Sequence, residues 1–277
     1  MIAAVGSDKG SPGATTLALL LGATWPTDRV VAELDPAGAD LPYRVSSLDG
    51  QPLAASPTIT TLAVDSRPGA PGHPLHIYTQ PTAGGVPLLV GESSAARFTR
   101  IAAHLPAVTE VFASASEMVF ADLGRLHAAS PVLPVARAAT VTVVVSRADT
   151  ASLGHLRDRV EDLGGALGGP HRLRSPLAVV VRADRRDAHA AEARVGKLLA
   201  SVGSPVVVLG VLPEDPAGVA ALHAGTSIRR RSRSGLLAAG RDIAGRLQAS
   251  WPELTDPVPS RIDLSAPRAP SAIGSRP

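Results

Sequence analysis

The sequence predicts an α/β fold in which helices cover both faces of a mainly parallel, doubly wound central sheet. Short runs rich in Val, Ile, Leu and Ala are continuous rather than alternating, as in strands buried on both faces. Helix-like segments lie between most of these runs, and strands that alternate with helices form βαβ units. Apolar residues make up 45% of the 277 residues, which is enough for a substantial core.

The order of these elements predicts one large domain. The predicted strands cover residues 2–5, 30–34, 76–79, 118–121, 140–145, 177–181 and 206–211. The predicted helices cover residues 15–23, 93–105, 151–163, 188–202 and 235–248. Residues 46–91 are rich in Pro, Gly, Ser and Thr, and we expect one or two short strands among loops there. We assign residues 1–248 to the domain and residues 249–277 to a proline-rich disordered tail.

Composition excludes several classes of protein. The chain has no cysteine, so disulfides, thiolate catalysis and cysteine-bound zinc are excluded. The N-terminus lacks the pattern of a signal peptide, and the apolar runs are shorter than the roughly 20 residues of a membrane span. These features predict a soluble, cytoplasmic protein. The sequence has no G-x-S-x-G or G-x-G-x-x-G pattern, which disfavours a hydrolase and a dinucleotide-binding dehydrogenase.

The segment after the first strand has the residue types of a phosphate-binding loop. Gly13, Ala14 and Thr15 occupy the last three positions of the pattern G-x-x-x-x-G-K-[ST], with alanine in place of lysine. Glycine lets backbone N–H groups turn toward phosphate oxygens, and the start of the next helix adds about half a positive charge. The Thr15 hydroxyl is suited to bind Mg²⁺. A glycine-rich turn without a ligand is the alternative.

Residues 9–16, KGSPGATT, resemble the deviant P-loop K-G-G-x-G-K-[ST]-T of the ParA/MinD family of ATPases. Lys9 matches the family's signature lysine, which reaches across a dimer interface to the partner's nucleotide. The resemblance implies a catalytic role for Lys9 and a site for ATP or ADP with Mg²⁺. The loop residues that it assigns to this site are Gly10, Ser11, Pro12, Gly13, Ala14, Thr15 and Thr16. Ser11 and Ala14 depart from the family's pattern.

Three later segments resemble the same family in the same order. Residues 30–38, VVAELDPAG, resemble its second strand and D-x-D-P-Q-G ending, where Asp35 matches the aspartate that orients the attacking water. Residues 118–125, MVFADLGR, look like a Walker B strand, whose Asp122 would hold Mg²⁺ together with Thr15. Residues 206–216, VVVLGVLPEDP, are similar to the element near the nucleotide base, which assigns Pro213 and Asp215 to the cofactor site. Each segment alone also suits a strand that ends in a turn.

The resemblance implies a three-layer P-loop fold and a nucleotide-binding protein with weak or absent ATP hydrolysis. Losing the lysine contact costs on the order of 3 kcal/mol, or about a hundredfold in rate. Lys9 or Arg125 could compensate. The chain would act as a dimerising switch or scaffold in chromosome partitioning, division or polar positioning. The alternative is a catalytically silent interaction protein of a secretion or pilus machine that binds no nucleotide.

The remaining expectations concern partners. A nucleotide-dependent homodimer follows from the match at Lys9, and the tail could bind another protein. The basic run could contact DNA phosphates without sequence preference, or be a solvated surface. Its arginines are Arg229, Arg230, Arg231 and Arg233. The last predicted helix suits packing on the domain at least as well as a membrane surface, and the tail after it is proline-rich, so membrane targeting is disfavoured.

Overall fold

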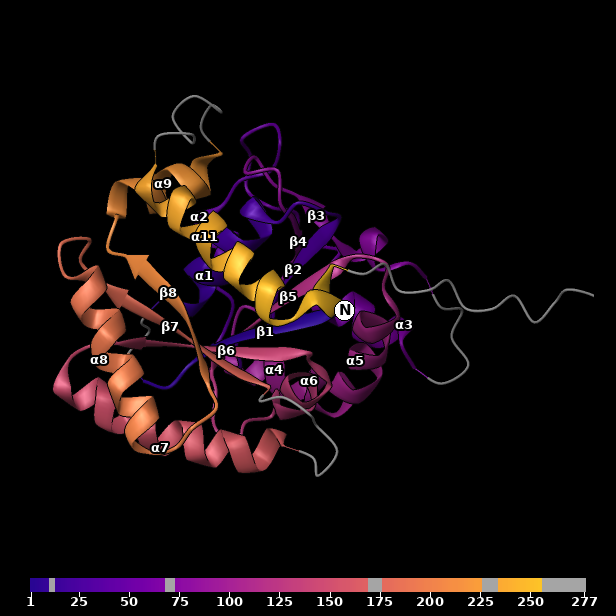
Figure 1. Cartoon of the computed structure of the whole chain (residues 1–277). Coiled ribbons are helices and arrows are strands. Elements are labelled where there is room, and N and C mark those ends of the chain that lie inside the picture. Colours follow the sequence, from indigo (N-terminus) through magenta and orange to yellow (C-terminus); the bar gives the residue numbers. More distant parts are fainter. Residues whose placement is uncertain (10–12, 68–72, 169–175, 226–233, 256–277) are drawn as a thin grey trace, which may run out of the picture.

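The computed structural model describes residues 1–9, 13–67, 73–168, 176–225 and 234–255. Within them, one eight-stranded sheet has the order β3-β4-β2-β5-β1-β6-β7-β8 (Figure 1). Every neighbouring pair is parallel except the edge pair β3 and β4. The strands are β1 (Ile2–Ser7), β2 (Arg29–Glu33), β3 (Gln80–Pro81), β4 (Pro87–Leu89), β5 (Met118–Arg125), β6 (Val141–Arg147), β7 (Leu177–Ala183) and β8 (Val207–Pro213).

Helices cover both faces of this sheet, which confirms the predicted doubly wound architecture (Figure 1). One face is covered by α1 (Ala14–Thr24), α9 (Pro216–Ala224) and α11 (Gly235–Ser250). The other is covered by α3 (Ile59–Asp65), α4 (Ala95–Ile101), α5 (Leu105–Ser114), α6 (Leu133–Ala138), α7 (Thr150–Leu167) and α8 (Ala188–Ser201). The short helix α2 (Leu41–Arg44) follows β2.

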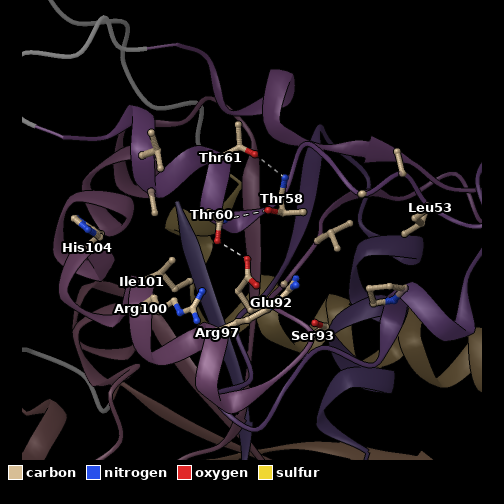
Figure 2. Close-up of a pocket in the computed structure, with 17 residues that line it drawn as sticks. Leu53, Thr58, Thr60, Thr61, Glu92, Ser93, Arg97, Arg100, Ile101 and His104 are labelled. Carbon is tan, nitrogen blue, oxygen red and sulfur yellow. Dashed lines mark hydrogen bonds between the residues drawn. The ribbon is translucent and has the colours of Figure 1, made fainter.

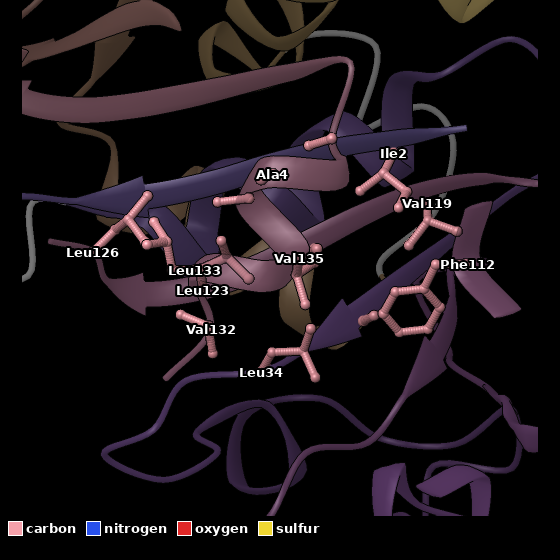
Figure 3. Close-up of a cluster of buried hydrophobic side chains, with 14 of the residues drawn as sticks. Ile2, Ala4, Leu34, Phe112, Val119, Leu123, Leu126, Val132, Leu133 and Val135 are labelled. Atoms are coloured by element: carbon pink, nitrogen blue, oxygen red, sulfur yellow. The ribbon is translucent and has the colours of Figure 1, made fainter. Parts of the chain in front are cut away.

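Side chains on the two faces of β1 belong to two separate apolar clusters. Ile2 and Ala4 lie in the cluster with Phe112 of α5 and Val135 of α6 (Figure 3). Ala3 and Val5 lie in the cluster with α1 and α11 on the opposite face. The strand is therefore apolar at every position from Ile2 to Val5, which is why it reads as a continuous apolar run.

The segment between α2 and β4 differs from the prediction. The strand predicted at residues 76–79 is wrong, because Leu75–Tyr78 forms a short 3-10 helix whose Leu75 and Tyr78 are buried. The one or two short strands expected among the loops of this region correspond to β3 and β4. The helix α3 was not predicted; Thr58 begins it, with a side chain that accepts a hydrogen bond from the Thr60 N–H. The conformation of such short segments depends on which residues are buried in the folded domain, and secondary-structure propensity alone does not predict it.

The packed chain continues beyond the predicted domain boundary at residue 248. Helix α11 ends at Ser250, and a single 3-10 turn, η3 (Pro252–Leu254), follows it. Trp251 and Leu254 are both only 3% exposed and join the cluster that contains α1. Residues 256–277, the rest of the predicted tail, lie outside the described residues. Within the described ranges, no helix has the length and apolar character needed to cross a bilayer.

Candidate functional site

The predicted site residues lie at the carboxyl edge of the sheet. β1 sits between β5 and β6, and the chain runs from its carboxyl end through the opening loop into α1. β2, β5 and β8 end at the same edge because they run parallel within one sheet. In open α/β sheets this edge, near the point where the strand order reverses, is where ligands bind.

The end of the opening loop has the backbone form expected of a tight strand-to-helix turn. Gly13 has φ of 108°, which favours glycine, and its carbonyl accepts the Leu17 N–H at 2.9 Å. A Cβ at Gly13 would lie 3.1 Å from Leu212 Cδ2, so β8 packs against the loop. Thr15 and Thr16 lie in the first turn of α1, and Ala14 at its start is buried. Gly10, Ser11 and Pro12 lie outside the described residues.

Asp122 of β5 lies beside Thr15 of α1 at the carboxyl edge of the sheet. Its side chain is fully buried, and its Oδ1 accepts the Gly124 N–H at 3.1 Å. Its Oδ2 has no hydrogen-bond partner among the described residues. Burial raises the pKa of Asp122 to about 6, while the Thr15 hydroxyl and the Gly124 N–H oppose the rise. The structure thus brings together the two predicted magnesium ligands, with one buried oxygen left to bind a ligand.

Asp35 lies against the end of β5. Its Oδ1 accepts the Ala37 N–H at 2.8 Å, which closes the turn after β2. A Cβ at Gly124 would lie 2.1 Å from Asp35 Cγ, so a side chain at residue 124 would displace this carboxylate. Burial raises the pKa of Asp35, and the charge of Asp35 contributes to the raised pKa of Asp122. The carboxylate predicted to orient water therefore lies near the predicted metal ligands.

Glu33 is a buried carboxylic acid for which the sequence suggested no role. Its Oε1 accepts the N–H groups of Asp40 and Leu41 at 2.7 and 2.9 Å, and its Oε2 has no partner among the described residues. Burial raises the pKa of Glu33 to about 7, with the Asp122 charge as a further cause. Glu33 thus fixes the segment that carries Asp35 and begins α2.

Lys9 is exposed, next to a residue that is tightly held. The carboxylate of Asp8 pairs with Arg159 of α7, whose two nitrogens lie 2.7 Å from Oδ1. Arg125 Nε donates to the Asp8 carbonyl at 2.9 Å, which places Arg125 at the opening loop. Sequence reasoning missed the pair of Asp8 and Arg159, because 151 residues separate them and no local pattern links them.

Of the two residues predicted to lie near the nucleotide base, Pro213 and Asp215, it is Asp215 whose side chain forms a hydrogen bond that fixes the local fold. Asp215 caps α9, since its Oδ1 accepts the Gly218 N–H at 2.8 Å, while Pro213 is buried at the strand end. Between them, Glu214 pairs with Arg147 at 3.0 Å and Arg182 at 3.4 Å. These three charged residues line a hollow of about 390 Å³ at the ends of β6 and β7.

The donor set suits a metal shared with a ligand rather than a metal held by the protein alone. Among the described residues, no group of three or more His, Asp or Glu side chains could hold a metal ion. Mg²⁺ at phosphate sites takes only one or two protein oxygens, with the rest from phosphates and water. Thr15 and Asp122 fit that limited share. The arginines predicted to bind DNA, residues 229–231 and 233, lie outside the described residues.

Solved structures share this fold at low sequence identity. A ParA family ATPase from Chlorobium tepidum is 16% identical, covering 88% of this chain and 98% of that one, with a TM-score of 0.67. MinD from Pyrococcus horikoshii, complexed with Mg-ADP, is 17% identical, with 92% and 98% coverage and a TM-score of 0.64. A putative plasmid partition protein from Borrelia burgdorferi, bound to AMPPNP, is 11% identical, with 90% and 98% coverage and a TM-score of 0.60.

No protein-family model and no curated protein sequence matches the chain. The structure nevertheless has the P-loop fold of the MinD and ParA ATPases, as the short sequence motifs predicted.

Proposed function

We propose that the chain binds ATP or ADP with Mg²⁺ at the opening loop and hydrolyses ATP slowly or not at all. The observation that carries this proposal is the buried, unpartnered Oδ2 of Asp122 beside Thr15 at the start of α1. A buried carboxylate oxygen without a partner is costly unless a ligand satisfies it. The shared fold of nucleotide-bound MinD from Pyrococcus horikoshii supports the same site.

Each residue at this edge has a proposed part. Thr15 and Asp122 would hold Mg²⁺, which would neutralise phosphate charge when bound. The backbone of residues 10–16 would face the phosphates, and Asp35 would orient water. Pro213 and Asp215 would lie near the base. Glu33 keeps Asp35 in place through the N–H groups of Asp40 and Leu41.

Ala14 is the reason for expecting weak hydrolysis. A lysine there would place a positive charge near the terminal phosphates, and alanine supplies none. Lys9 is exposed, and Arg125 lies at the loop through its contact with the Asp8 carbonyl. Either cation could supply part of the missing charge, Lys9 in the same chain or across a homodimer. We expect at least about a hundredfold slower hydrolysis than with lysine at this position.

The cellular role that we propose is a nucleotide-dependent, dimerising switch or scaffold for partitioning, division or polar positioning. The solved complex of MinD with MinC from Aquifex aeolicus is one example of this fold joined to a partner protein. Nonspecific DNA contact through Arg229, Arg230, Arg231 and Arg233, and a protein partner for residues 256–277 of the predicted tail, belong to this proposal. Alanine at position 14 also favours the second candidate, a silent interaction protein that binds no nucleotide.

Titration calorimetry with ATP and with ADP, in Mg²⁺, tests the proposal on the native chain, Ala14→Lys and Ala14→Gln. Glutamine is the matched control, because it adds a long side chain without charge. Micromolar binding by the native chain supports the proposal. Binding by Ala14→Lys alone supports the silent scaffold, and no binding by any of the three chains removes the nucleotide site.

The dimer has a separate test. Light scattering after gel filtration should show a dimer with ATP and a monomer without it. Lys9→Ala should then lose the dimer while it keeps some nucleotide affinity, because the proposed contact of Lys9 is with the partner's nucleotide. Lys197→Ala, on the exterior of α8, is the matched lysine control. A native chain that stays monomeric at saturating ATP would exclude the switch.

A further inference from the structure

A second hollow lies at the carboxyl end of β4, away from the opening loop. Its volume is about 640 Å³, within the roughly 300–1,000 Å³ of small-molecule sites. Its walls come from α3, α4 and the segments that precede them (Figure 2). None of Thr15, Asp35 and Asp122 lines it. It is therefore a different cavity from the proposed nucleotide site.

A buried carboxylate, Glu92, faces this hollow. Glu92 is 9% exposed, and its Oε1 accepts a hydrogen bond from the Thr60 hydroxyl (Figure 2). No described residue donates a hydrogen bond to its Oε2. An ionised carboxylate is an acceptor only, so it is satisfied by N–H or O–H donors or by cations. The hollow thus presents free acceptor capacity to a ligand.

Two positively charged side chains also line this hollow (Figure 2). Arg97 and Arg100 are three residues apart on α4 and so share one face of the helix, and both line the hollow together with His104. Neither arginine forms an ion pair with a carboxylate in the part of the chain that the structure describes. Guanidinium groups bind phosphate through paired hydrogen bonds. An anionic group is therefore the matching partner for this wall.

Apolar side chains line the hollow as well. They are Ala63, Val64, Val90, Ile101 and Leu53, and Leu53 lies on the side away from His104 (Figure 2). Such a lining suits a flat ring whose edges carry the polar groups. A matching ligand therefore combines N–H donors, an apolar ring face and an anionic group.

We propose that this hollow binds a guanine mononucleotide. Guanine presents two neighbouring N–H donors on one edge, which can both point at the oxygens of Glu92. The phosphate can then reach Arg97 and Arg100. Adenine presents an amino donor beside an acceptor nitrogen, which the carboxylate repels. Inosine keeps one donor and lacks the exocyclic amine, so its affinity should be intermediate.

A bound nucleotide would lie against the segment that positions Asp35. The Glu92 carbonyl accepts the Ala39 N–H at 2.7 Å. A Cβ at Gly38 would lie 3.0 Å from the Ser93 carbonyl oxygen, so the two segments are in close contact. The hollow is thus adjacent to the predicted catalytic segment and separate from the phosphate loop.

The test is titration calorimetry of the full chain with GMP, IMP and AMP in buffer with EDTA. We expect micromolar affinity for GMP, about tenfold weaker binding of IMP, and at least about a hundredfold weaker binding of AMP, since the loss of one hydrogen bond to a charged group weakens binding by about tenfold or more. Equal affinity for GMP and AMP, or no GMP binding at millimolar concentration, would overturn the proposal.

Variants locate the binding. Glu92→Gln should weaken GMP at least about tenfold and narrow the difference between GMP and AMP. Arg97→Gln, on the exposed rim, should weaken all three nucleotides together and has little reason to disturb folding. Glu110→Gln on α5 and Arg157→Gln on α7 are exposed matched controls that should bind GMP as the native chain does. GMP affinity that is unchanged in both Glu92→Gln and Arg97→Gln would place the nucleotide elsewhere and sink the assignment.

Discussion

The guanidinium of Arg159 holds the carboxylate of Asp8, with two nitrogens 2.7 Å from the same oxygen, Oδ1. Both side chains are largely buried, at 17% and 8% exposed. Arg125 holds the carbonyl of the same residue from the end of β5. The last residue before Lys9 is thus fixed by a helix and a strand that are distant in sequence. The pair sets where the opening loop leaves the sheet.

Arg159→Met should lower the free energy of unfolding by roughly 2–3 kcal/mol, because it leaves the Asp8 carboxylate buried without its partner. Arg157→Met is the matched control on the same helix. Its ion pair with Asp158 is exposed on both sides, so its loss should cost less than about 1 kcal/mol. Urea denaturation of both variants measures the difference. Equal losses would show that the contact with Asp8 does not stabilise the fold.

Gly124→Ala should destabilise the chain more than its backbone angle alone predicts. Gly124 has φ of 59°, and an added Cβ would meet the Asp35 carboxylate at 2.1 Å. Gly203 has φ of 63° with nothing within 4 Å of its Cβ position, so Gly203→Ala isolates the backbone cost of about 1 kcal/mol. Crowding should add roughly 1–3 kcal/mol at residue 124. Thermal or urea unfolding that gives the same loss for both variants would contradict this contact.

The sequence predicted the parts of this fold that depend on local pattern. The central strands were predicted because residues buried on both faces are apolar at consecutive positions, as in β1 and β6. The strands β3 and β4, at one side of the sheet, contain two and three residues, too few to show any periodicity. The sequence did not predict five helices: α5, α6, α9 and the short α2 and α3. Their apolar faces are short, or a proline stands at the start of the helix.

In the candidate site, too, some residues were predicted from local sequence patterns and others depend on tertiary structure. Thr15 was predicted from the pattern of a phosphate-binding loop, and Asp122 from the resemblance of residues 118–125 to a Walker B strand. The contact of Arg159 with Asp8 depends on where α7 lies relative to the end of β1, which no local pattern encodes. The role of Glu33 depends on the turn of backbone that brings Asp40 and Leu41 back to it. The hollow at Glu92 is likewise formed by tertiary packing and has no motif.

Glu33→Gln should flatten the pH dependence of stability. Burial raises the pKa of Glu33 from 4.5 to about 7, so the folded chain keeps a proton that the unfolded chain has released. The protonated Glu33 therefore contributes stability that is fully present below about pH 4.5 and is lost as the pH rises through 7. Between pH 5 and 8 the native chain should lose on the order of 2–3 kcal/mol more than the variant. Glutamine can still accept the two N–H groups through its amide oxygen.

The control for this pH profile is Glu110→Gln, which changes an exposed carboxylate on α5 and should keep the native slope. The pKa of Asp122 is raised as well, so part of the slope should remain in Glu33→Gln and become smaller in the double variant with Asp122→Asn. Urea denaturation at each pH gives the comparison. A Glu33→Gln profile parallel to that of the native chain would mean that Glu33 is ionised in the folded state throughout.

Thr15→Ala separates metal binding from phosphate binding at the opening loop. If the Thr15 hydroxyl holds Mg²⁺ beside Asp122, its removal should weaken ADP by about tenfold in Mg²⁺, the loss of one such contact, and leave the affinity in EDTA unchanged. Thr16→Ala, one residue further along the first turn of α1, is the matched control. Its hydroxyl would act on phosphate directly, so it should weaken ADP equally with and without Mg²⁺. Calorimetry of both variants in the two buffers decides the assignment, because a Thr15→Ala loss that persists in EDTA would move the metal away from Thr15.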